Sequence, residues 1–254
     1  MTINQVFEIL KDAGGIRAAR IITDNIKNPS RLRVWIMARA LRRGTPVAKI
    51  IHQKWFYGLK FYTNKYTLDP RPDTETLVAA VIADNPAAPK ILDIGTGTGC
   101  IIISLVKNIY GAYGVGVDIS RSAIRVARRN LQDLGVADKI KICRASFNNP
   151  NMVHEKFDII VSNPPYIARG DTRVDTGAKH DPRIALYADR GGTATYEQIA
   201  KNAKNWIKPN GKIYLEIGAG QMAAVKKIFE SAGWKFIRAE HDLGNIIRVL
   251  VFNI

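Results

Sequence analysis

The chain has 254 residues, which is enough for one large α/β domain with a small helical piece. Its 38 Lys and Arg residues against 22 Asp and Glu give a formal net charge of +16, so we expect acidic partners, either a protein or a nucleic acid. No apolar run approaches the roughly 20 residues of a membrane span, the start lacks an apolar secretory core, and two cysteines support neither a disulfide framework nor a metal cluster. We therefore expect a soluble, cytoplasmic protein without a metal site.

Residues 1–44 are predicted to form a short helical domain. Thr2 and Gln5 suit a capping box at the start of one helix, and Ser30 can cap a later helix that ends near Arg43. The apolar face of this later helix is expected to be core and consists of Val34, Met37, Ala38 and Leu41. Its other side is mostly basic and carries Arg31, Trp35, Arg39, Arg42 and Arg43. A solvated face is the simpler interpretation of that basic side, and binding of a partner is the alternative.

Residues 45–72 are predicted to link this helical domain to the main domain, with a β-hairpin at 55–61. In the main domain, 73–254, strand-like apolar runs alternate with helices, which is typical of a doubly wound parallel sheet. The expected parallel strands are 90–94, 114–118, 138–143, 157–162 and 212–216. The last two runs, 235–240 and 246–252, are separated by a short loop and should close an edge of the sheet as an antiparallel pair.

A glycine-rich loop follows the first of these strands, in the run Asp93-Ile94-Gly95-Thr96-Gly97-Thr98-Gly99. Its alternate glycines allow positive φ angles and a close approach of the backbone to a ligand. The loop departs from the GxGxxG pattern of dinucleotide sites, so pyrophosphate binding is the less favoured use. The next strand ends in Asp118, where an acid that grips ribose hydroxyls should fall. Together these features indicate a cofactor that carries adenosine without phosphates.

The tetrapeptide Asn163-Pro164-Pro165-Tyr166 directly follows the predicted strand 157–162. Two prolines fix φ near −65° and remove two backbone donors, which leaves carbonyl groups free to accept hydrogen bonds. An Asn side-chain oxygen beside such a carbonyl can accept both hydrogens of a planar –NH2 group, and a tyrosine ring can stack on that plane. An ordinary turn after a strand is the alternative interpretation. The glycine loop earlier in the chain favours chemistry on a flat amino group.

With these motifs the chain resembles the S-adenosylmethionine-dependent methyltransferases, and among them the HemK family of release-factor glutamine methyltransferases, over residues 44–254. The resemblance extends to the segments 44–50, 55–61, 70–78, 181–186 and 215–218 and to Gln221. It implies a class I methyltransferase fold, with a mostly parallel seven-stranded sheet and a small helical N-terminal domain. It also implies methyl transfer from S-adenosyl-L-methionine to the N5 nitrogen of the glutamine in the Gly-Gly-Gln motif of a class I peptide chain release factor.

The resemblance also implies which residues do this. The substrate amide would be held by Asn163, Pro164, Pro165 and Tyr166. The cofactor would be bound by Asp93, Gly95, Thr96, Gly97, Thr98, Gly99, Asp118, Ser146, Phe147 and Asn163. Arg71 and Glu75 are expected to shape the same pocket.

The chain departs from the family pattern at three places. The region before Gly44 is shorter than the usual helical domain, and Asp69 stands where an apolar residue is usual before Pro-Arg-Pro. Ala145 takes the place of an acidic residue that commonly closes the third strand near the adenine. We therefore expect adenine to rest on Ser146, Phe147 and backbone groups.

Two other functions stay open at this point. The acceptor could be N6 of adenine or another exocyclic amine of RNA or DNA, because the same tetrapeptide serves planar amino groups of bases and the charge suits phosphates. A basic RNA-binding protein with a degenerate cofactor site would fit Ala145, but the intact Asn163 and Asp118 argue against it. We expect a release factor rather than nucleic acid or a membrane as the partner, and a monomer as the simplest oligomeric state.

Overall fold

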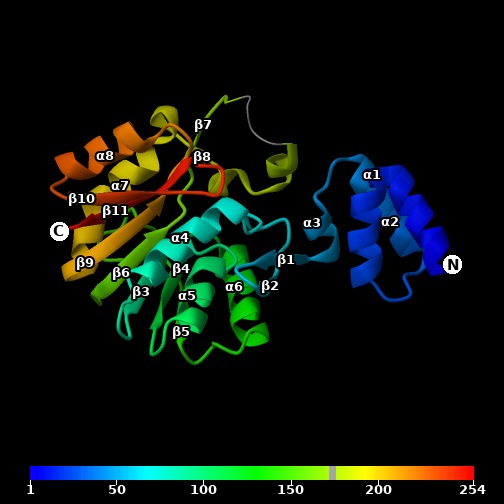
Figure 1. Cartoon of the computed structure of the whole chain (residues 1–254), viewed down its shortest axis with the longest axis horizontal. Helices are drawn as coiled ribbons and strands as arrows, with labels where there is room; N and C mark the ends of the chain where they lie inside the picture. The colour runs from blue at the N-terminus through cyan, green and yellow to red at the C-terminus, as the bar shows by residue number, and fades with distance from the viewer. Residues whose placement is uncertain (172–175) are drawn as a thin grey trace.

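The structure is a computed structural model that describes residues 1–171 and 176–254. Within them the chain forms a seven-stranded sheet in the order β10-β11-β9-β6-β3-β4-β5, covered by helices on both faces (Figure 1). Its strands are β3 (Lys90–Ile94), β4 (Tyr113–Asp118), β5 (Ile140–Arg144), β6 (Phe157–Ser162), β9 (Ile207–Glu216), β10 (Lys235–His241) and β11 (Ile247–Asn253). The strands from β5 to β9 in this order run parallel, and β11 pairs antiparallel with both β9 and β10. The predicted fold class is confirmed, including the antiparallel pair at one edge.

Strand β9 begins earlier than the sequence predicts. The expected start at residue 212 follows 209–211, which are typical turn residues. In the structure β9 extends back to Ile207, and its pairing with β6 contains a register shift near Asn210, whose φ is 63°. The turn-like residues therefore form an irregularity within the strand and do not end it.

Helices α4, α5 and α6 cover one face of the sheet, and α7 and α8 cover the other. Their bounds are α4 (Pro72–Ala83), α5 (Cys100–Asn108), α6 (Arg121–Asp133), α7 (Ala194–Asn202) and α8 (Met222–Ser231). Successive residues of a strand point to opposite faces, so β3 supplies Ile91 to the first layer and Leu92 to the second. Both layers are apolar, which explains why the parallel strands are nearly continuous apolar runs.

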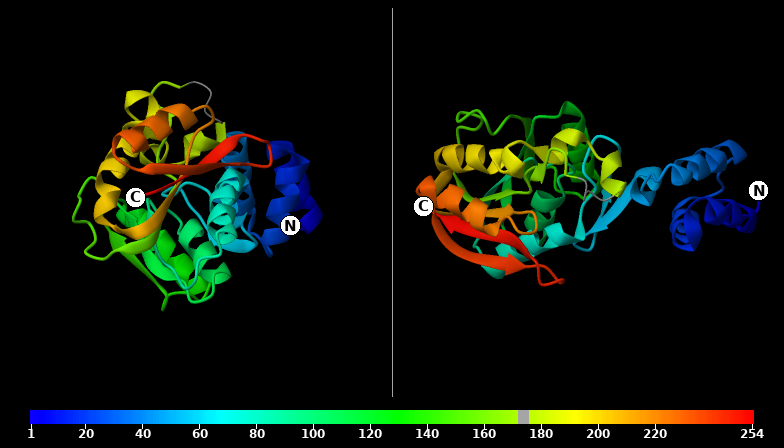
Figure 2. Two further views of the ribbon diagram at one scale, coloured as in Figure 1. Left: turned by 60° about the vertical axis from the view of Figure 1, so that its left-hand side comes forward. Right: turned by 90° about the horizontal axis from the view of Figure 1, so that it is seen from above.

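The N-terminal helices form a hydrophobic cluster of their own and stand away from the sheet (Figure 2). The elements are α1 (Ile3–Asn25), α2 (Arg31–Arg42) and α3 (Val47–Ile51), followed by the hairpin of β1 (Gln53–Phe56) and β2 (Leu59–Tyr62). The predicted capping box of Thr2 and Gln5, the Ser30 cap and the buried apolar face of α2 are all present. Helix α1 is broken at Gly15, which has a φ of 85°. The division of the chain at residues 44 and 72 stays a prediction.

Short elements connect β6 to β9 around α7. Strand β7 (Ile167–Ala168) pairs in parallel with β8 (Tyr187–Ala188). The 3-10 turns are η1 (Thr176–His180), η2 (Arg183–Ala185), η3 (Arg190–Gly192) and η4 (Ala203–Asn205). In the part of the chain that the structure describes, no helix is both long enough and apolar enough to cross a bilayer.

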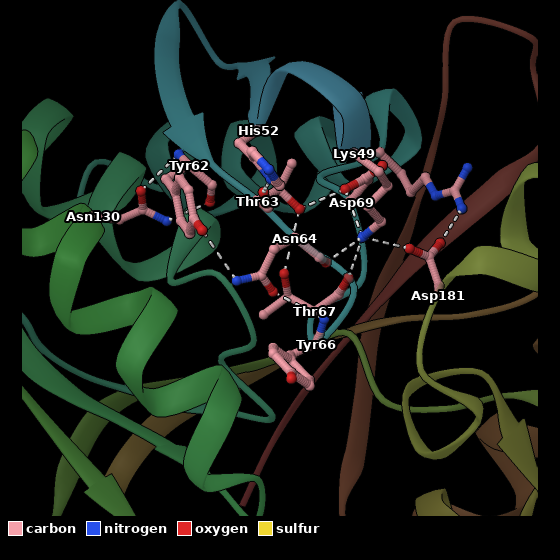
Figure 3. A network of polar contacts seen from close by, with 11 residues as sticks. Lys49, His52, Tyr62, Thr63, Asn64, Tyr66, Thr67, Asp69, Asn130 and Asp181 are labelled. Atoms are coloured by element: carbon pink, nitrogen blue, oxygen red, sulfur yellow. Dashed lines mark hydrogen bonds and ion pairs between the residues drawn. The ribbon is translucent and has the colours of Figure 1, made fainter. Parts of the chain in front are cut away.

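The buried side chain of Asn130 in α6 bonds to Tyr62 of the hairpin (Figure 3) and also to the glycine loop. Its Oδ1 accepts from the Tyr62 N–H at 2.7 Å, and its Nδ2 donates to the carbonyls of Tyr62 and Thr98 at 3.0 and 2.8 Å. One amide therefore satisfies three backbone groups from two distant segments, which fixes where the linker meets the main domain.

We expect Asn130→Ala to lower the free energy of unfolding by about 3 kcal/mol. Each buried backbone group left without a partner costs roughly 1–3 kcal/mol, and water that enters the space can bond to these groups and reduce the total cost. Urea denaturation measures the loss. The matched control is Asn25→Ala, whose exposed amide bonds only to the Ile21 carbonyl of its own helix. The control should lose no more than about 0.5 kcal/mol. A similar, small loss in both variants would contradict the role of Asn130.

Candidate functional site

The order of the strands reverses between β3 and β6, and both sequence motifs lie at this point. From β3 the sheet continues to β4 and β5 on one side and to β6 and β9 on the other. Ile94 pairs with Ser162, whose hydroxyl donates to the Ile94 carbonyl at 2.7 Å. The glycine loop after β3 and the tetrapeptide after β6 therefore emerge next to each other, at the edge where ligands bind in sheets of this kind.

The glycine loop turns back onto β4 through three positive φ angles. These are 75° at Gly95, 55° at Gly97 and 81° at Gly99. The N–H groups of Gly95 and Thr96 both donate to the Val117 carbonyl, at 2.9 and 3.0 Å. A Cβ added at Gly95 would meet no protein atom within 4 Å, so the absence of a side chain leaves open space beside the backbone. The loop thus has the form of a cradle for a ligand.

Asp118, at the end of β4, holds this loop through hydrogen bonds to backbone N–H groups. Its Oδ2 accepts from the Gly97 N–H at 3.0 Å and its Oδ1 from the Ser120 N–H at 2.8 Å. Burial raises the pKa of the Asp118 carboxyl, and these amide donors oppose the shift. Each oxygen of a carboxylate can accept a further hydrogen bond, so hydroxyl groups of a ligand can still bind here.

Asp93 lies buried under the loop. Its Oδ2 accepts from the Thr96 hydroxyl at 2.6 Å, whereas its Oδ1 has no hydrogen-bond partner among the described residues. Burial raises the pKa of Asp93 to about 7, and the nearby charge of Asp118 adds to the effect. The loop residues that face the cavity described next are Gly95 and Gly97. The others are buried or turned away from it and support the loop: Asp93, Thr96, Thr98 and Gly99.

A cavity of about 290 Å³ opens along the glycine loop. Of the residues predicted to bind the cofactor, those that line it are Gly95, Gly97, Asp118, Ser146, Phe147 and Asn163. Ala145 also lines it, so the missing acidic residue is a feature of the cavity wall itself. The lining also includes residues 66–68 of the linker and Pro182, Ile184, Ala185 and Tyr187. Apolar walls, one carboxylate and an open glycine backbone fit a cofactor of the S-adenosyl-L-methionine type.

A second cavity, of about 450 Å³, adjoins the first. Arg71 and Tyr166 line it, as the sequence predicts. Three residues, Leu68, Asn163 and Ala185, line both cavities. The two spaces therefore share a wall, and the side chain of Asn163 stands where a ligand in one would meet a ligand in the other.

The Asn163 side chain is oriented by a hydroxyl group. Its Nδ2 donates to Thr74 Oγ1 at 3.0 Å. Thr74 lies in the first turn of α4, and its hydroxyl also favours the ionised form of Glu216, which opposes the rise in the pKa of that carboxyl. Because the amide nitrogen of Asn163 is held in this way, its Oδ1 stays available to accept hydrogen bonds from a substrate.

Glu216, at the end of β9, lines the second cavity and was not assigned a role from the sequence. Its Oε1 accepts from the Tyr166 hydroxyl at 3.4 Å, and its Oε2 has no hydrogen-bond partner within the described part of the chain. Burial raises the pKa of Glu216 to about 7, the Thr74 hydroxyl and Arg248 oppose this shift, and Asp73 adds to it. The available signal was its position: like Asp118, it is the last residue of a parallel strand, and Asn163 directly follows another.

Glu75 does not shape the pocket, which corrects one expectation. Its Oε1 accepts from the Tyr57 N–H in the hairpin turn at 2.8 Å. Neighbouring residues of a helix point about 100° apart, so Thr74 faces the site while Glu75 faces the hairpin. The sequence also gave no sign that linker residues 66–68 form a cavity wall.

Comparison with known proteins agrees with this geometry. Residues 69–180 match the family model of the methyltransferase small domain. The chain is 37% identical over 229 residues to the release factor glutamine methyltransferase of Agrobacterium fabrum, covering 87% of this chain and 78% of that protein. It is 40% identical over 240 residues to a bifunctional methyltransferase of Rickettsia felis, covering 82% of this chain but 45% of that protein. The chain thus spans less than half the length of this bifunctional relative.

A crystal structure of a methyltransferase from Pyrococcus furiosus superimposes with a TM-score of 0.60 at 17% identity, covering 78% of this chain and 91% of that one. At this identity the likeness shows the fold alone. The fold is that of the class I methyltransferases, and the glycine loop and the joined cavities lie at its switch point. Within this class, the chain belongs to the release factor glutamine methyltransferase family.

We expect Asp118→Ala to weaken binding of S-adenosylhomocysteine by about 1.5–3 kcal/mol, the usual strength of hydrogen bonds to a charged group. Isothermal titration calorimetry gives the affinity without any substrate. The matched control is Asp133→Ala, because Asp133 pairs with Arg129 on the exposed side of α6. Equal affinity in Asp118→Ala and the control would exclude Asp118 from the cofactor site.

We expect Glu216→Gln to become relatively more stable than the unmodified chain as pH rises. The folded-state pKa of Glu216 is raised from 4.5 to about 7, so the folded protein holds this proton more tightly and loses stability as pH rises through that interval. Gln cannot ionise and escapes this loss. From about pH 5 to about pH 8, urea denaturation should show a gain for the variant that reaches up to about 3 kcal/mol. A difference in stability that is the same at both pH values would contradict the raised pKa of Glu216.

Proposed function

We propose that the chain transfers a methyl group from S-adenosyl-L-methionine to the side-chain amide nitrogen, N5, of the glutamine in the Gly-Gly-Gln motif of a class I release factor. The observation that carries this proposal is the position of Asn163, which lines both cavities and whose Oδ1 has no hydrogen-bond partner among the described residues. Membership of the release factor glutamine methyltransferase family supports the choice of substrate. Because release factors act in translation, we place the reaction in the cytoplasm.

The amide nitrogen of a glutamine is a poor nucleophile, because its lone pair is delocalised into the carbonyl group. In this proposal one –NH2 hydrogen is accepted by Asn163 Oδ1 and the other by the carbonyl of Pro164, which lies beyond the end of β6 and outside the sheet ladder. Both bonds draw electron density toward the nitrogen and fix its direction. Holding the reacting atoms in line can lower the activation free energy by roughly 7–11 kcal/mol.

Tyr166 forms the side of the substrate cavity, with its hydroxyl directed to Glu216. Burial raises the pKa of this hydroxyl, so the ring stays a neutral wall. Gly95, Gly97 and Asp118 would hold the cofactor, which supplies an electrophilic methyl group on a sulfonium. When nitrogen gains the methyl group it gives up one proton, which water or, transiently, the Asn163 oxygen can accept.

Methylation of an exocyclic amine in RNA or DNA is the second candidate. It is favoured by the net charge of +16 and by the exposed arginines of α2, since basic surfaces attract phosphates. Those arginines are equally suited to an acidic protein surface. The two candidates differ in which molecule receives the methyl group, and that difference can be measured directly.

We expect Asn163→Ala to slow methyl transfer to a release factor by on the order of 10²-fold while affinity for S-adenosylhomocysteine changes little, because the substitution removes an orienting acceptor. Labelled cofactor is incubated with release factor and with RNA, and mass spectrometry locates the label. The control variant is Asn151→Ala, which alters an exposed loop residue. Label on adenine with the release-factor glutamine unmodified would favour the second candidate. An unaltered rate in Asn163→Ala would exclude the proposed hydrogen bond from the glutamine amide to Asn163.

A further inference from the structure

A buried lysine, Lys49, lies among polar groups from two separate loops (Figure 3). The Lys49 side chain, in α3, is 5% exposed, and its Nζ donates to the carbonyls of Asn64 and Thr67 at 2.7 and 2.5 Å. The same nitrogen forms ion pairs with Asp69 Oδ1 at 2.8 Å and Asp181 Oδ1 at 2.9 Å. Four groups from two separate loops thus meet at one ammonium group.

The partners of Lys49 belong to two neighbouring segments that line the cofactor cavity, here called its two walls. Thr67 lies within the lining residues 66–68, and Asn64 and Asp69 lie close to them in the chain. Asp181 directly precedes the turn 182–187, four residues of which also line the cavity. Leu68 and Ala185, one from each wall, also line the second cavity. Lys49 lines neither space, so any influence on a ligand must act through the position of these walls.

Neither wall belongs to the seven-stranded sheet, so its position depends on contacts such as these. Asp69 also accepts from the Thr63 hydroxyl at 2.5 Å, and Asp181 pairs with Arg71 at 2.6 Å. The carboxyl groups of Asp69 and Asp181 are both buried, and both form an ion pair with Lys49. Removing Lys49 takes the buried cation from Asp69 and leaves Asp181 with Arg71, and the loss of a buried cation favours opening of the loops or entry of water.

The other residues of α3 connect Lys49 to the N-terminal helices. Val47, Ile50 and Ile51 pack against the hydrophobic cluster of α1 and α2. A short helix of five residues therefore has one side in that cluster and its lysine between the cavity walls. Movement of the N-terminal helices would be transmitted to the walls through this side chain.

We propose that Lys49 is a positioning residue, which holds the two walls of the cofactor cavity at a fixed separation and couples them to the N-terminal helices. The inference rests on the proposed function only through the identity of the cofactor. It can be tested without a release factor.

The test measures binding of S-adenosylhomocysteine by calorimetry and hydrogen exchange of residues 178–187 by mass spectrometry. Lys49→Met, which keeps an unbranched side chain one atom shorter and without the charge, should bind about 10-fold or more weakly and exchange faster in this segment. The control is Lys60→Met, because Lys60 is exposed in the hairpin, where it lies over the Trp55 ring. Both of its readouts should match the unmodified chain.

A second pair of variants separates positioning from loss of folding. Lys49→Met/Asp69→Leu removes the cation together with one carboxylate and should recover affinity to within about 3-fold. Asp181→Asn keeps Lys49 and its carbonyl contacts but weakens the bridge, so faster exchange and about 3-fold or more weaker binding are expected even if Lys49→Met does not fold. Unchanged affinity and exchange in Lys49→Met, or in Asp181→Asn, would overturn the proposal. Absence of methyl transfer to release factors would leave these results unaffected.

Discussion

The parallel pairing of β3 with β6 is the constraint on which the site depends. Because the strand order reverses there, two loops from distant parts of the sequence emerge side by side with no helix between them. The hydrogen bond from Ser162 to the Ile94 carbonyl fixes their register at the last paired residues. One loop offers backbone without side chains, and the other offers Asn163. Each loop alone would be an ordinary turn, and their adjacency creates two cavities with a common wall.

Buried ionisable groups surround this junction. Asp93 and Glu216 both have pKa values raised to about 7 by burial, and each has one carboxyl oxygen without a hydrogen-bond partner among the described residues. Such groups are costly for folding, and they are concentrated where the chain must hold a loop or a side chain in one orientation. Lys49 is a further buried ionisable group that holds chain segments in one arrangement, here the two walls of the cofactor cavity. A buried ion pair fixes the direction of a contact, which apolar packing does not.

The sequence predicted the strands of the sheet well, since buried parallel strands are short apolar runs between helices. It also placed the glycine loop, Asp118 and Asn163, whose residue types are tied to local backbone chemistry. It failed for Glu75, because the direction of a helical side chain depends on how the helix packs. It did not find the wall at 66–68 or the role of Lys49, since these arise from contacts between segments more than a hundred residues apart, such as Lys49 with Asp181. The predicted start of β9 at residue 212 was too late, because pairing with β6 overrides the local turn preference of residues 209–211.

The central claim is that Asn163 presents its oxygen to a planar amide at the shared wall of the two cavities. A crystal structure of the chain with S-adenosylhomocysteine and a release factor tests it most directly. The account predicts the glutamine amide nitrogen in the cavity lined by Tyr166 and Glu216, about 3 Å from Asn163 Oδ1. It also predicts the adenosine beside Gly95 and Asp118. A glutamine bound away from Asn163, or a cofactor outside the cavity along the glycine loop, would contradict it.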